Sequence, residues 1–360
     1  MTRPDLAVVG GGLVGRLLAW RAARAGLNVA LYDAASRLGK SSAAWAAAGM
    51  ITPAAEVVDA DEEIVAMGRH SLTLWPQWLS EMPLPVFYRD RGTLLLWHRE
   101  DAGEARRFDI MSRSRDPHTE LTRVYGDDLR QLEPAIAPGF PSAMYLPGEA
   151  QVDNRELLLA VAAALDEAHV ECHWNTPITD DTWPEAGTVI DCRGMGARPD
   201  WQDLRGVRGE VVRLHAPEIE LGHMLRLLHP RYSVYVVPRA EGHLVVGATS
   251  IESEDRSEVS VRGALELLSS AYSMLPALAE ARILEFATQV RPALQDNRPA
   301  FHYDPLRKVF RINGLYRHGF LLSPTVVEAA MMWLASPESA ANVIPWQCLR
   351  DFDHEEAPCP

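Results

Sequence analysis

The stretch Leu6-Ala7-Val8-Val9-Gly10-Gly11-Gly12-Leu13-Val14-Gly15 decides the fold, because it joins a short apolar run to a glycine-rich turn. Its first four residues are typical of a buried strand, and the apolar spacing of residues 14–25 is typical of a helix. Gly26 supplies a stop for this helix, and residues 29–32 form a second apolar run. The pattern predicts a strand–helix–strand unit of about 30 residues.

The glycines of this turn have the spacing Gly10-x-Gly12-x-x-Gly15, and Asp33 ends the second strand. The first glycine permits a tight turn, the second lets a pyrophosphate approach the backbone, and the third lets helix and strand pack closely. The helix start, at Leu13 and Val14, offers free N–H groups to the phosphates. Asp33 would accept hydrogen bonds from the ribose hydroxyls. These features together predict a dinucleotide site.

Later segments alternate between two kinds of pattern. Strand patterns separated by short turns, such as Ala240-Glu241-Gly242, predict an antiparallel sheet. Helices and strands of the α/β type return between them, and we expect the last strand, loop and helix to rejoin the first unit. The predicted strands of the antiparallel sheet are residues 91–97, 210–215, 233–238 and 243–249; the other predicted elements are helices 155–167, 262–275 and 320–334 and strands 170–174, 188–192 and 308–313.

Charge and composition exclude several classes of protein. The 360 residues carry 35 Lys and Arg against 49 Asp and Glu, a formal charge of −14, so we expect no nucleic-acid partner. The longest apolar runs are about half the ~20 residues of a membrane-spanning helix, so no membrane span is expected. The first residues lack the apolar core of a secretory signal, which predicts a cytoplasmic location. The four cysteines form no zinc-type cluster, and no metal is expected.

Residues 41–50, Ser-Ser-Ala-Ala-Trp-Ala-Ala-Ala-Gly-Met, are a run of small side chains that follows the predicted dinucleotide unit. An ordinary nicotinamide dehydrogenase would continue its helix here. Small side chains let a chain lie against a flat, bulky ligand, which favours FAD. The same composition also fits an Ala-rich buried helix, so the residues alone leave both interpretations open.

Four segments together resemble the D-amino-acid oxidase family of flavoproteins. The match runs from residue 5 to about residue 335 in consistent order, and within the family it most resembles the glycine oxidases of the thiazole-forming thiamine pathway. The segments are the first fifty residues; Tyr235-Val236-Val237-Pro238-Arg239 with Val245-Val246-Gly247-Ala248-Thr249; Arg291-Pro292-Ala293-Leu294; and Gly314-Leu315-Tyr316-Arg317-His318-Gly319-Phe320-Leu321-Leu322-Ser323-Pro324.

The resemblance implies an α/β fold, with a Rossmann-like FAD-binding domain and an interleaved antiparallel-sheet substrate domain. Residues 1–80, 145–205 and 295–345 would form the FAD-binding domain. Residues 81–144 and 206–294 would form the substrate domain, and residues 346–360 a tail. Residues 191–196 depart from the usual Ala-x-Gly-x-Trp pattern of relatives, which leaves the shape of the pocket open.

The resemblance also implies which residues hold the cofactor. FAD would be noncovalent, because residues 294–297 carry no cysteine where sarcosine-oxidase relatives have one. Carried over by position, the FAD-binding residues are Gly10, Gly12, Leu13, Val14, Gly15 and Asp33 at the turn; Ser42, Ala44, Ala48, Gly49 and Met50 along the flavin; Ile178 on the adenine side; Gly194; and Gly314, Tyr316, Arg317, His318, Gly319, Phe320, Leu321 and Leu322 around the pyrimidine end of the flavin.

The implied substrate site contains Arg291, Tyr235 and Arg317. Arg291 would grip a carboxylate, for which the planar guanidinium is well matched. The implied reaction is oxidative deamination of glycine or a small glycine-like amine by hydride transfer to flavin N5, with no dedicated base. Oxygen would reoxidise the flavin and give H₂O₂, and the imine would supply thiazole synthesis.

Three points stay open at this stage. The substrate is one of them, since an N-substituted glycine such as sarcosine or a small D-amino acid fits the same pattern. The electron acceptor is another, because an FAD dehydrogenase with a carrier other than O₂ has the same fold. Family members often associate, so a homo-oligomer stays open as well.

Overall fold

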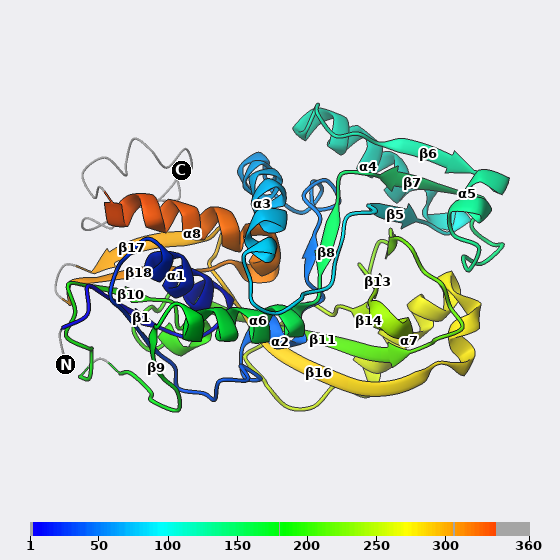
Figure 1. Cartoon of the computed structure of the whole chain (residues 1–360). Coiled ribbons are helices and arrows are strands. Elements are labelled where there is room, and N and C mark those ends of the chain that lie inside the picture. Colours follow the sequence, from blue (N-terminus) through cyan, green and yellow to red (C-terminus); the bar gives the residue numbers. More distant parts are fainter. Residues whose placement is uncertain (1–2, 180, 305–306, 336–360) are drawn as a thin grey trace.

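The computed structural model describes residues 3–179, 181–304 and 307–335. They form an α/β fold with two large sheets side by side (Figure 1). A helix-covered sheet lies on the left of this view, and the long strands β11 (Arg205–His215) and β16 (Arg282–Ala293) run from the centre to the right. This arrangement confirms the predicted fold class. The predicted tail, residues 346–360, lies outside the described residues.

The first sheet has six strands in the order β17-β18-β10-β1-β2-β9. Neighbouring strands are parallel, except that β17 runs antiparallel to β18. The central strand is completely apolar and buried, as parallel sheets covered on both faces require. The predicted strand–helix–strand unit is therefore confirmed. The strands are β1 (Leu6–Val9), β2 (Val29–Tyr32), β9 (Glu171–His173), β10 (Thr188–Asp191), β17 (Ala300–Asp304) and β18 (Val309–Asn313).

Four helices pack on one face of this sheet, and a loop covers the other. Leu6 and Val8 of β1 join the core beneath the helices. Ala7 and Val9 point the opposite way, against a small cluster that includes Ile178. This alternation follows from the two-residue period of a strand. The helices are α1 (Leu13–Arg24), α3 (Glu62–Ser80), α6 (Asn154–Glu167) and α8 (Gly319–Ala335).

The second sheet has nine strands, in the order β15-β11-β14-β13-β12-β5-β7-β6, with β16 paired to the outer side of β11. Most of its pairs are antiparallel, but β5 and β12 run parallel. The predicted hairpin at residues 240–242 joins β13 to β14. The strands not yet bounded are β5 (Thr93–Leu96), β6 (Thr122–Tyr125), β7 (Ser142–Leu146), β12 (Met224–Leu227), β13 (Tyr235–Pro238), β14 (His243–Gly247) and β15 (Ile251–Glu252).

A small third sheet, β3-β8-β4, connects the two large ones. Its strands are β3 (Met50–Ile51), β4 (Tyr88–Arg89) and β8 (Ala150–Val152), and the remaining α-helices are α2 (Ala43–Ala46), α4 (Ala102–Arg115), α5 (Gly126–Leu132) and α7 (Val261–Met274).

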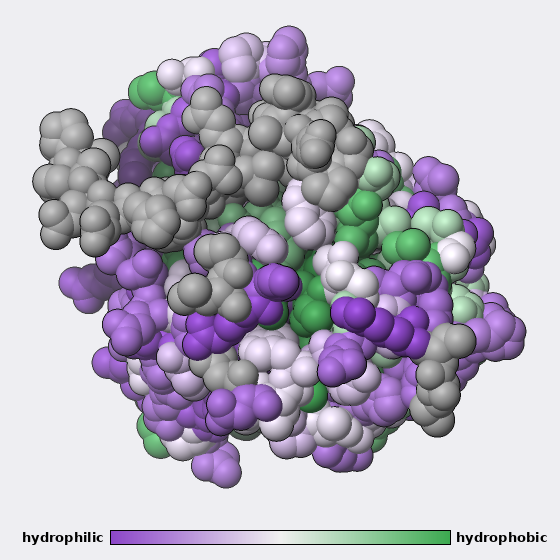
Figure 2. All heavy atoms as spheres, turned by 90° about the vertical axis from the view of Figure 1, so that its left-hand side faces the viewer, coloured by the Kyte–Doolittle hydropathy of each residue, from purple (hydrophilic) through white to green (hydrophobic). Residues whose placement is uncertain are grey.

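All strands of the six-stranded sheet fall within residues 1–80, 145–205 and 295–345, whereas the nine-stranded sheet is built almost entirely from residues 81–144 and 206–294. The domain boundaries themselves stay a prediction. The face turned toward the viewer in Figure 2 is mainly hydrophilic, with hydrophobic residues in a narrow central strip. Within the described residues, no helix is both long and apolar enough to cross a bilayer, and no group of His, Cys, Asp and Glu side chains could hold a metal ion.

Candidate active site

The glycine turn after β1 forms a cradle in which side chains have no room. Gly10 adopts a left-handed φ of 109°, and a Cβ there would lie 2.5 Å from the Cys192 carbonyl. A Cβ on Gly15 would lie 1.8 Å from the Gly10 oxygen, so this glycine lets α1 approach the turn. Gly12 caps α1 without any side-chain hydrogen bond. The first N–H groups of α1 are therefore left to bind an anion.

Asp33 lies beside this cradle, at the end of β2. Its Oδ2 accepts a hydrogen bond from the Gly11 N–H, and its Oδ1 accepts one from the Ala35 N–H at 2.6 Å. The carboxylate is thus fixed at the rim of the turn by backbone donors. This position suits contact with a ribose next to the bound phosphates.

A single cavity of about 1060 Å³ runs from this turn to the second sheet. It contains nearly all the predicted site residues: Gly10, Gly12, Leu13, Val14, Asp33, Ser42, Ala44, Ala48, Gly49, Met50, Ile178, Gly194, Tyr235, Arg291, Tyr316, Arg317, His318, Gly319, Phe320 and Leu321. Three predicted cofactor residues do not line it. Gly15 packs against the Gly10 oxygen, and Leu322 is completely buried in the core. Gly314 adopts a left-handed backbone conformation with a φ of 79°. These three shape the cavity from outside.

The run of small residues forms the middle of the cavity wall. Only residues 43–46 are helical, and the chain then extends into β3, so the run is not a long Ala-rich helix. Ala46 and Ala48 pack against the inner face of the nine-stranded sheet. Asn154 fixes α2, because its Nδ2 donates to the carbonyls of Ala44 and Trp45 at 2.7 and 2.8 Å.

Arg291, on β16, is the partly buried cation at the far end of the cavity. Its Nη1 donates to the Thr249 carbonyl at 3.2 Å, and no carboxylate of the described residues lies within ion-pair distance. Gly209 permits this placement, since a Cβ there would lie 2.2 Å from the Arg291 Nη2. Burial lowers the pKa of Arg291 from its ordinary value, but an arginine stays charged.

Tyr235 lies next to Arg291 on the cavity wall. Burial raises the pKa of its phenol, so the hydroxyl stays protonated at neutral pH. A Cβ on Gly247 would lie 2.7 Å from this hydroxyl, so the glycine makes room for it. The structure therefore brings together a guanidinium and a phenol O–H, both of which can donate to a carboxylate.

Arg317, the third residue predicted to bind substrate, faces two acids instead. Its Nη2 lies 2.6 Å from the Glu56 Oε2 and 3.0 Å from the Asp59 Oδ2. Glu56, which was not among the predicted site residues, lines the cavity and also pairs with Arg226 at 3.1 Å. No local motif marks Glu56, because its arginine partners lie far away in the sequence.

His318 lies on the cavity wall and is buried. Burial lowers its pKa to about 4, so it is neutral at pH 7. His70 does not line the cavity; its Nε2 lies 2.5 Å from the Glu328 Oε2. His318 is therefore not a protonated acid toward the cavity at neutral pH.

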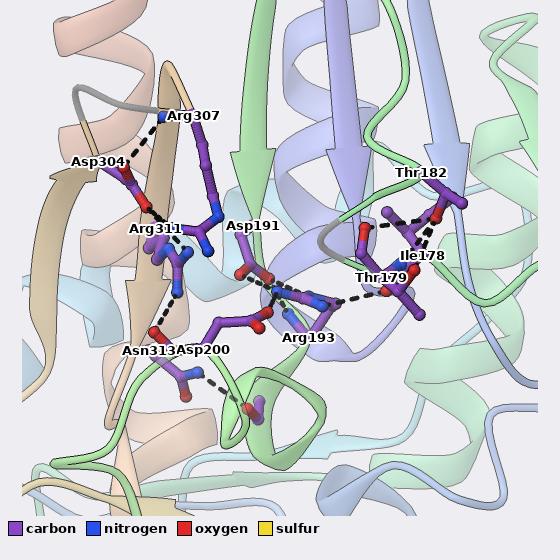
Figure 3. Close-up of polar contacts among 11 residues, drawn as sticks. Ile178, Thr179, Thr182, Asp191, Arg193, Asp200, Asp304, Arg307, Arg311 and Asn313 are labelled. Carbon is purple, nitrogen blue, oxygen red and sulfur yellow. Dashed lines mark hydrogen bonds and ion pairs between the residues drawn. The ribbon is translucent and has the colours of Figure 1, made fainter.

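Arg193, within the segment that departs from the family pattern, joins two parts of the cavity wall (Figure 3). Its guanidinium binds the Asp191 carboxylate, with Nη2 2.9 Å from Oδ2, and the Asp200 carboxylate at 2.5 Å. Its Nη1 donates to the Ile178 carbonyl at 3.0 Å. Gly194 is held as well, because its carbonyl accepts a hydrogen bond from Asn313 at 3.0 Å. The arginine thus fixes the Ile178 segment to the end of β10.

Glu149 lies behind the wall and gives a prediction for pH dependence. Its Oε1 accepts a hydrogen bond from the Ala55 N–H at 2.7 Å, and burial raises its pKa from 4.5 to about 7. The folded chain therefore holds this proton up to a higher pH than the unfolded chain, and the stability that it contributes is lost as pH rises from 4.5 through 7. Glu149→Gln removes this loss, so the difference in unfolding free energy between variant and wild type should shift toward the variant by about 3 kcal/mol between pH 4.5 and pH 8.

Urea unfolding of both proteins at several pH values measures this difference. A difference that stays constant over the whole range would show that Glu149 is ionised in the folded protein at pH 5.

The cavity fits a dinucleotide. A Cβ on Gly12 would meet nothing closer than the Ser42 Oγ at 3.5 Å, so the space in front of this glycine is open to a ligand. The uncapped start of α1 and the Asp33 carboxylate suit a pyrophosphate and a ribose. The volume exceeds the ~300–1,000 Å³ of pockets for drug-sized ligands, which leaves space for a small substrate beside Arg291.

Comparisons with known proteins agree with this geometry. A protein of Rhizobium etli named as a thiamine biosynthesis oxidoreductase, ThiO, is 36% identical over 319 residues, which cover 89% of this chain and 93% of that protein. The glycine oxidase of Geobacillus kaustophilus is 26% identical, with 97% of each chain covered. The crystal structure of glycine oxidase from the same organism matches with a TM-score of 0.84 at 25% identity, over 98% of this chain and 100% of that one.

The family described as "FAD dependent oxidoreductase" (DAO) matches residues 5–330. That span includes the glycine turn, the small-residue run and both arginines of the predicted substrate site. The chain belongs to this family of FAD dependent oxidoreductases.

Proposed function

We propose that the chain is an FAD-dependent oxidase of glycine or of a small glycine-like amine. The observation that carries this proposal is Arg291, a cation without a carboxylate partner among the described residues, at the end of a cavity that begins at a dinucleotide turn. The names of the relatives, which include glycine oxidases and ThiO, support the same reaction.

In this proposal the turn at residues 10–15 holds the pyrophosphate, Asp33 holds the ribose, and residues 41–50 lie along the flavin. When bound, FAD supplies the electron acceptor for a hydride from the substrate's α-carbon. We further propose that FAD is not covalently attached. Cys192 lines the cavity below the Gly10 turn, and burial raises its thiol pKa well above the ordinary value, which makes it a poor nucleophile.

The chain's own groups would bind and orient the substrate. Arg291 would hold the carboxylate through two N–H donors, and Tyr235 would donate a third hydrogen bond. Such anchoring fixes the direction of the α-C–H bond, which is the main catalytic contribution of a site without a base. Glu56 and His318 have pKa values of about 2 and about 4, too low for an efficient base at neutral pH. The amine would therefore lose its proton to water before the reaction.

We further propose O₂ as the electron acceptor, with H₂O₂ as its product. The imine formed from glycine would supply thiazole synthesis in the cytoplasm, in line with the thiamine biosynthesis role in the name of the Rhizobium etli relative.

An absorption spectrum of the purified protein, followed by anaerobic addition of amines, tests the proposal. We expect the absorption bands of a flavin, and these bands should bleach with glycine, sarcosine or D-alanine. Acid precipitation of the protein should release the flavin into the supernatant. On readmission of air, peroxide should form in proportion to the amine consumed. Bleaching without peroxide would point to another electron acceptor, and flavin bands that none of the amines bleaches would overturn the proposed substrate.

A further inference from the structure

Four charged side chains form a compact group on one side of the cavity, which we call the charge box: Glu56, Asp59, Arg226 and Arg317. Glu56 and Asp59 come from the segment between β3 and α3, Arg226 from β12, and Arg317 from the turn before α8. Each arginine contacts both acids. The Nη atoms of Arg317 and Arg226 lie 2.6 and 3.1 Å from Glu56, and 3.0 and 3.1 Å from Asp59.

Glu56 and Arg317 stabilise each other's charge. Burial alone would raise the pKa of Glu56, but Arg317 and Arg226 outweigh it and bring the pKa to about 2. The two carboxylates in turn raise the pKa of Arg317 above its ordinary value, against the effect of burial. Two positive and two negative charges therefore cancel within the charge box.

Arg291 differs from every other arginine of the cavity wall in the described part of the chain. Arg193, Arg226 and Arg317 are paired with carboxylates. The others, Arg231, Arg256 and Arg262, are exposed, so water and salt screen their charges. The buried interior of the cavity consequently presents one uncompensated positive charge, at Arg291.

We propose that Glu56 determines specificity: by neutralising Arg317 and Arg226, it restricts the enzyme to amines that carry a single carboxylate. The inference rests on the proposed function, and it assigns a substrate class within it. Arg291 satisfies one carboxylate. A second anionic group inside the cavity would meet the neutral charge box and stay without a partner, and an unpaired buried charge is strongly unfavourable.

Two N-substituted glycines that differ by one carboxylate group test this proposal. Sarcosine and N-(carboxymethyl)glycine are both N-substituted glycines, one with a methyl group and the other with a carboxymethyl group on nitrogen. The wild-type holoenzyme should prefer sarcosine in kcat/KM by about 100-fold or more. Glu56→Gln leaves the two arginines with only Asp59, a net charge of +1, and should shrink this preference at least tenfold, mainly through KM for the diacid.

The matched control is Glu266→Gln. Glu266 lines the same cavity, at its mouth, and contacts none of the three paired arginines. Its substitution makes the same change of charge, so the preference should stay within about twofold of wild type. Equal shifts in both variants would show that the overall field at the mouth sets specificity, which overturns the role of Glu56. A purely structural role would lower kcat for both substrates without changing their ratio, and it overturns the proposal too.

Two further measurements keep the test decisive. If Glu56→Gln does not fold, Arg317→Gln leaves the charge box with a net charge of −1, and the preference for sarcosine should increase at least threefold. An unchanged ratio of the two kcat/KM values contradicts the inference.

If the wild type oxidises none of the amines, the proposed function fails by itself. The inference is then tested by the melting temperature of the wild-type holoprotein, measured with acetate, a monocarboxylate, and with malonate, a dicarboxylate. Acetate should raise the melting temperature more than malonate does, and a larger rise with malonate overturns the inference.

Discussion

Arg291→Leu is expected to lower kcat/KM for glycine by about 10³-fold while the flavin stays bound. Loss of one partner from a buried, hydrogen-bonded charge pair costs about 2–5 kcal/mol, and each 1.4 kcal/mol corresponds to about tenfold. Arg291 has no carboxylate partner in the described part of the protein, so its removal leaves no buried acid behind and the fold should tolerate it. Steady-state kinetics with peroxide detection and the flavin spectrum of the same preparation measure both effects.

Two further variants separate the contribution of the charge of Arg291 from that of its planar guanidinium. Arg291→Lys keeps the charge but not the planar fork, so it should recover part of the activity, about tenfold over leucine. Arg256→Leu removes an exposed arginine from the cavity mouth and should change kcat/KM less than threefold. Activity within threefold of wild type for Arg291→Leu would mean that another group holds the carboxylate.

Gly15→Ala should destabilise the apoprotein by about 3 kcal/mol or more and abolish flavin binding. A Cβ at this position would lie 1.8 Å from the Gly10 oxygen, which is backbone and has no free direction in which to move. Overpacking of this kind costs about 1–3 kcal/mol, and more where the backbone must shift. Chemical unfolding of the FAD-free protein gives the stability, and fluorescence titration with FAD gives the affinity.

Gly12→Ala is the matched comparison, since the same methyl group meets nothing closer than 3.5 Å in the apoprotein. Its unfolding free energy should stay within about 1 kcal/mol of wild type, because alanine is no worse than glycine at an extended position. Affinity for FAD should nevertheless fall at least 100-fold, because the methyl group occupies the space in which a pyrophosphate approaches the backbone. Full FAD affinity in this variant would place the phosphates elsewhere.

Local pattern was enough to predict every strand of the first sheet except β17, which mixes apolar and polar residues. The strands β1 and β2 are continuous apolar runs, and Gly10, Gly12 and Gly15 form a recognisable motif within six residues of sequence. The hairpin at residues 240–242 was predictable for the same reason. The helix α3 was missed, although Asp61 caps it, accepting from the Ile64 N–H at 3.0 Å. Pro76 interrupts its pattern near the end.

Other features depend on partners distant in sequence. The parallel pair β5–β12 joins segments more than a hundred residues apart, and no periodicity reports such a pairing. The role of Arg317 is a similar case. Its position in the cavity followed from the family resemblance, but its neutralisation by Glu56 and Asp59 depends on a loop whose sequence carries no motif. The position of a residue could thus be predicted more easily than its electrostatic state.

The order of strands in the first sheet has a consequence for how the chain is made. Leu6 of β1 pairs with Thr188 of β10, and Val189 of β10 pairs in turn with Val309 of β18. On the ribosome, the phosphate-binding turn therefore emerges long before the strands that complete its sheet. The nascent chain must keep β1 and β2 without β10 and β9 until about half of the protein has been synthesised, and without β18 until nearly all of it has. A stop codon anywhere before β18 would consequently yield a chain without flavin.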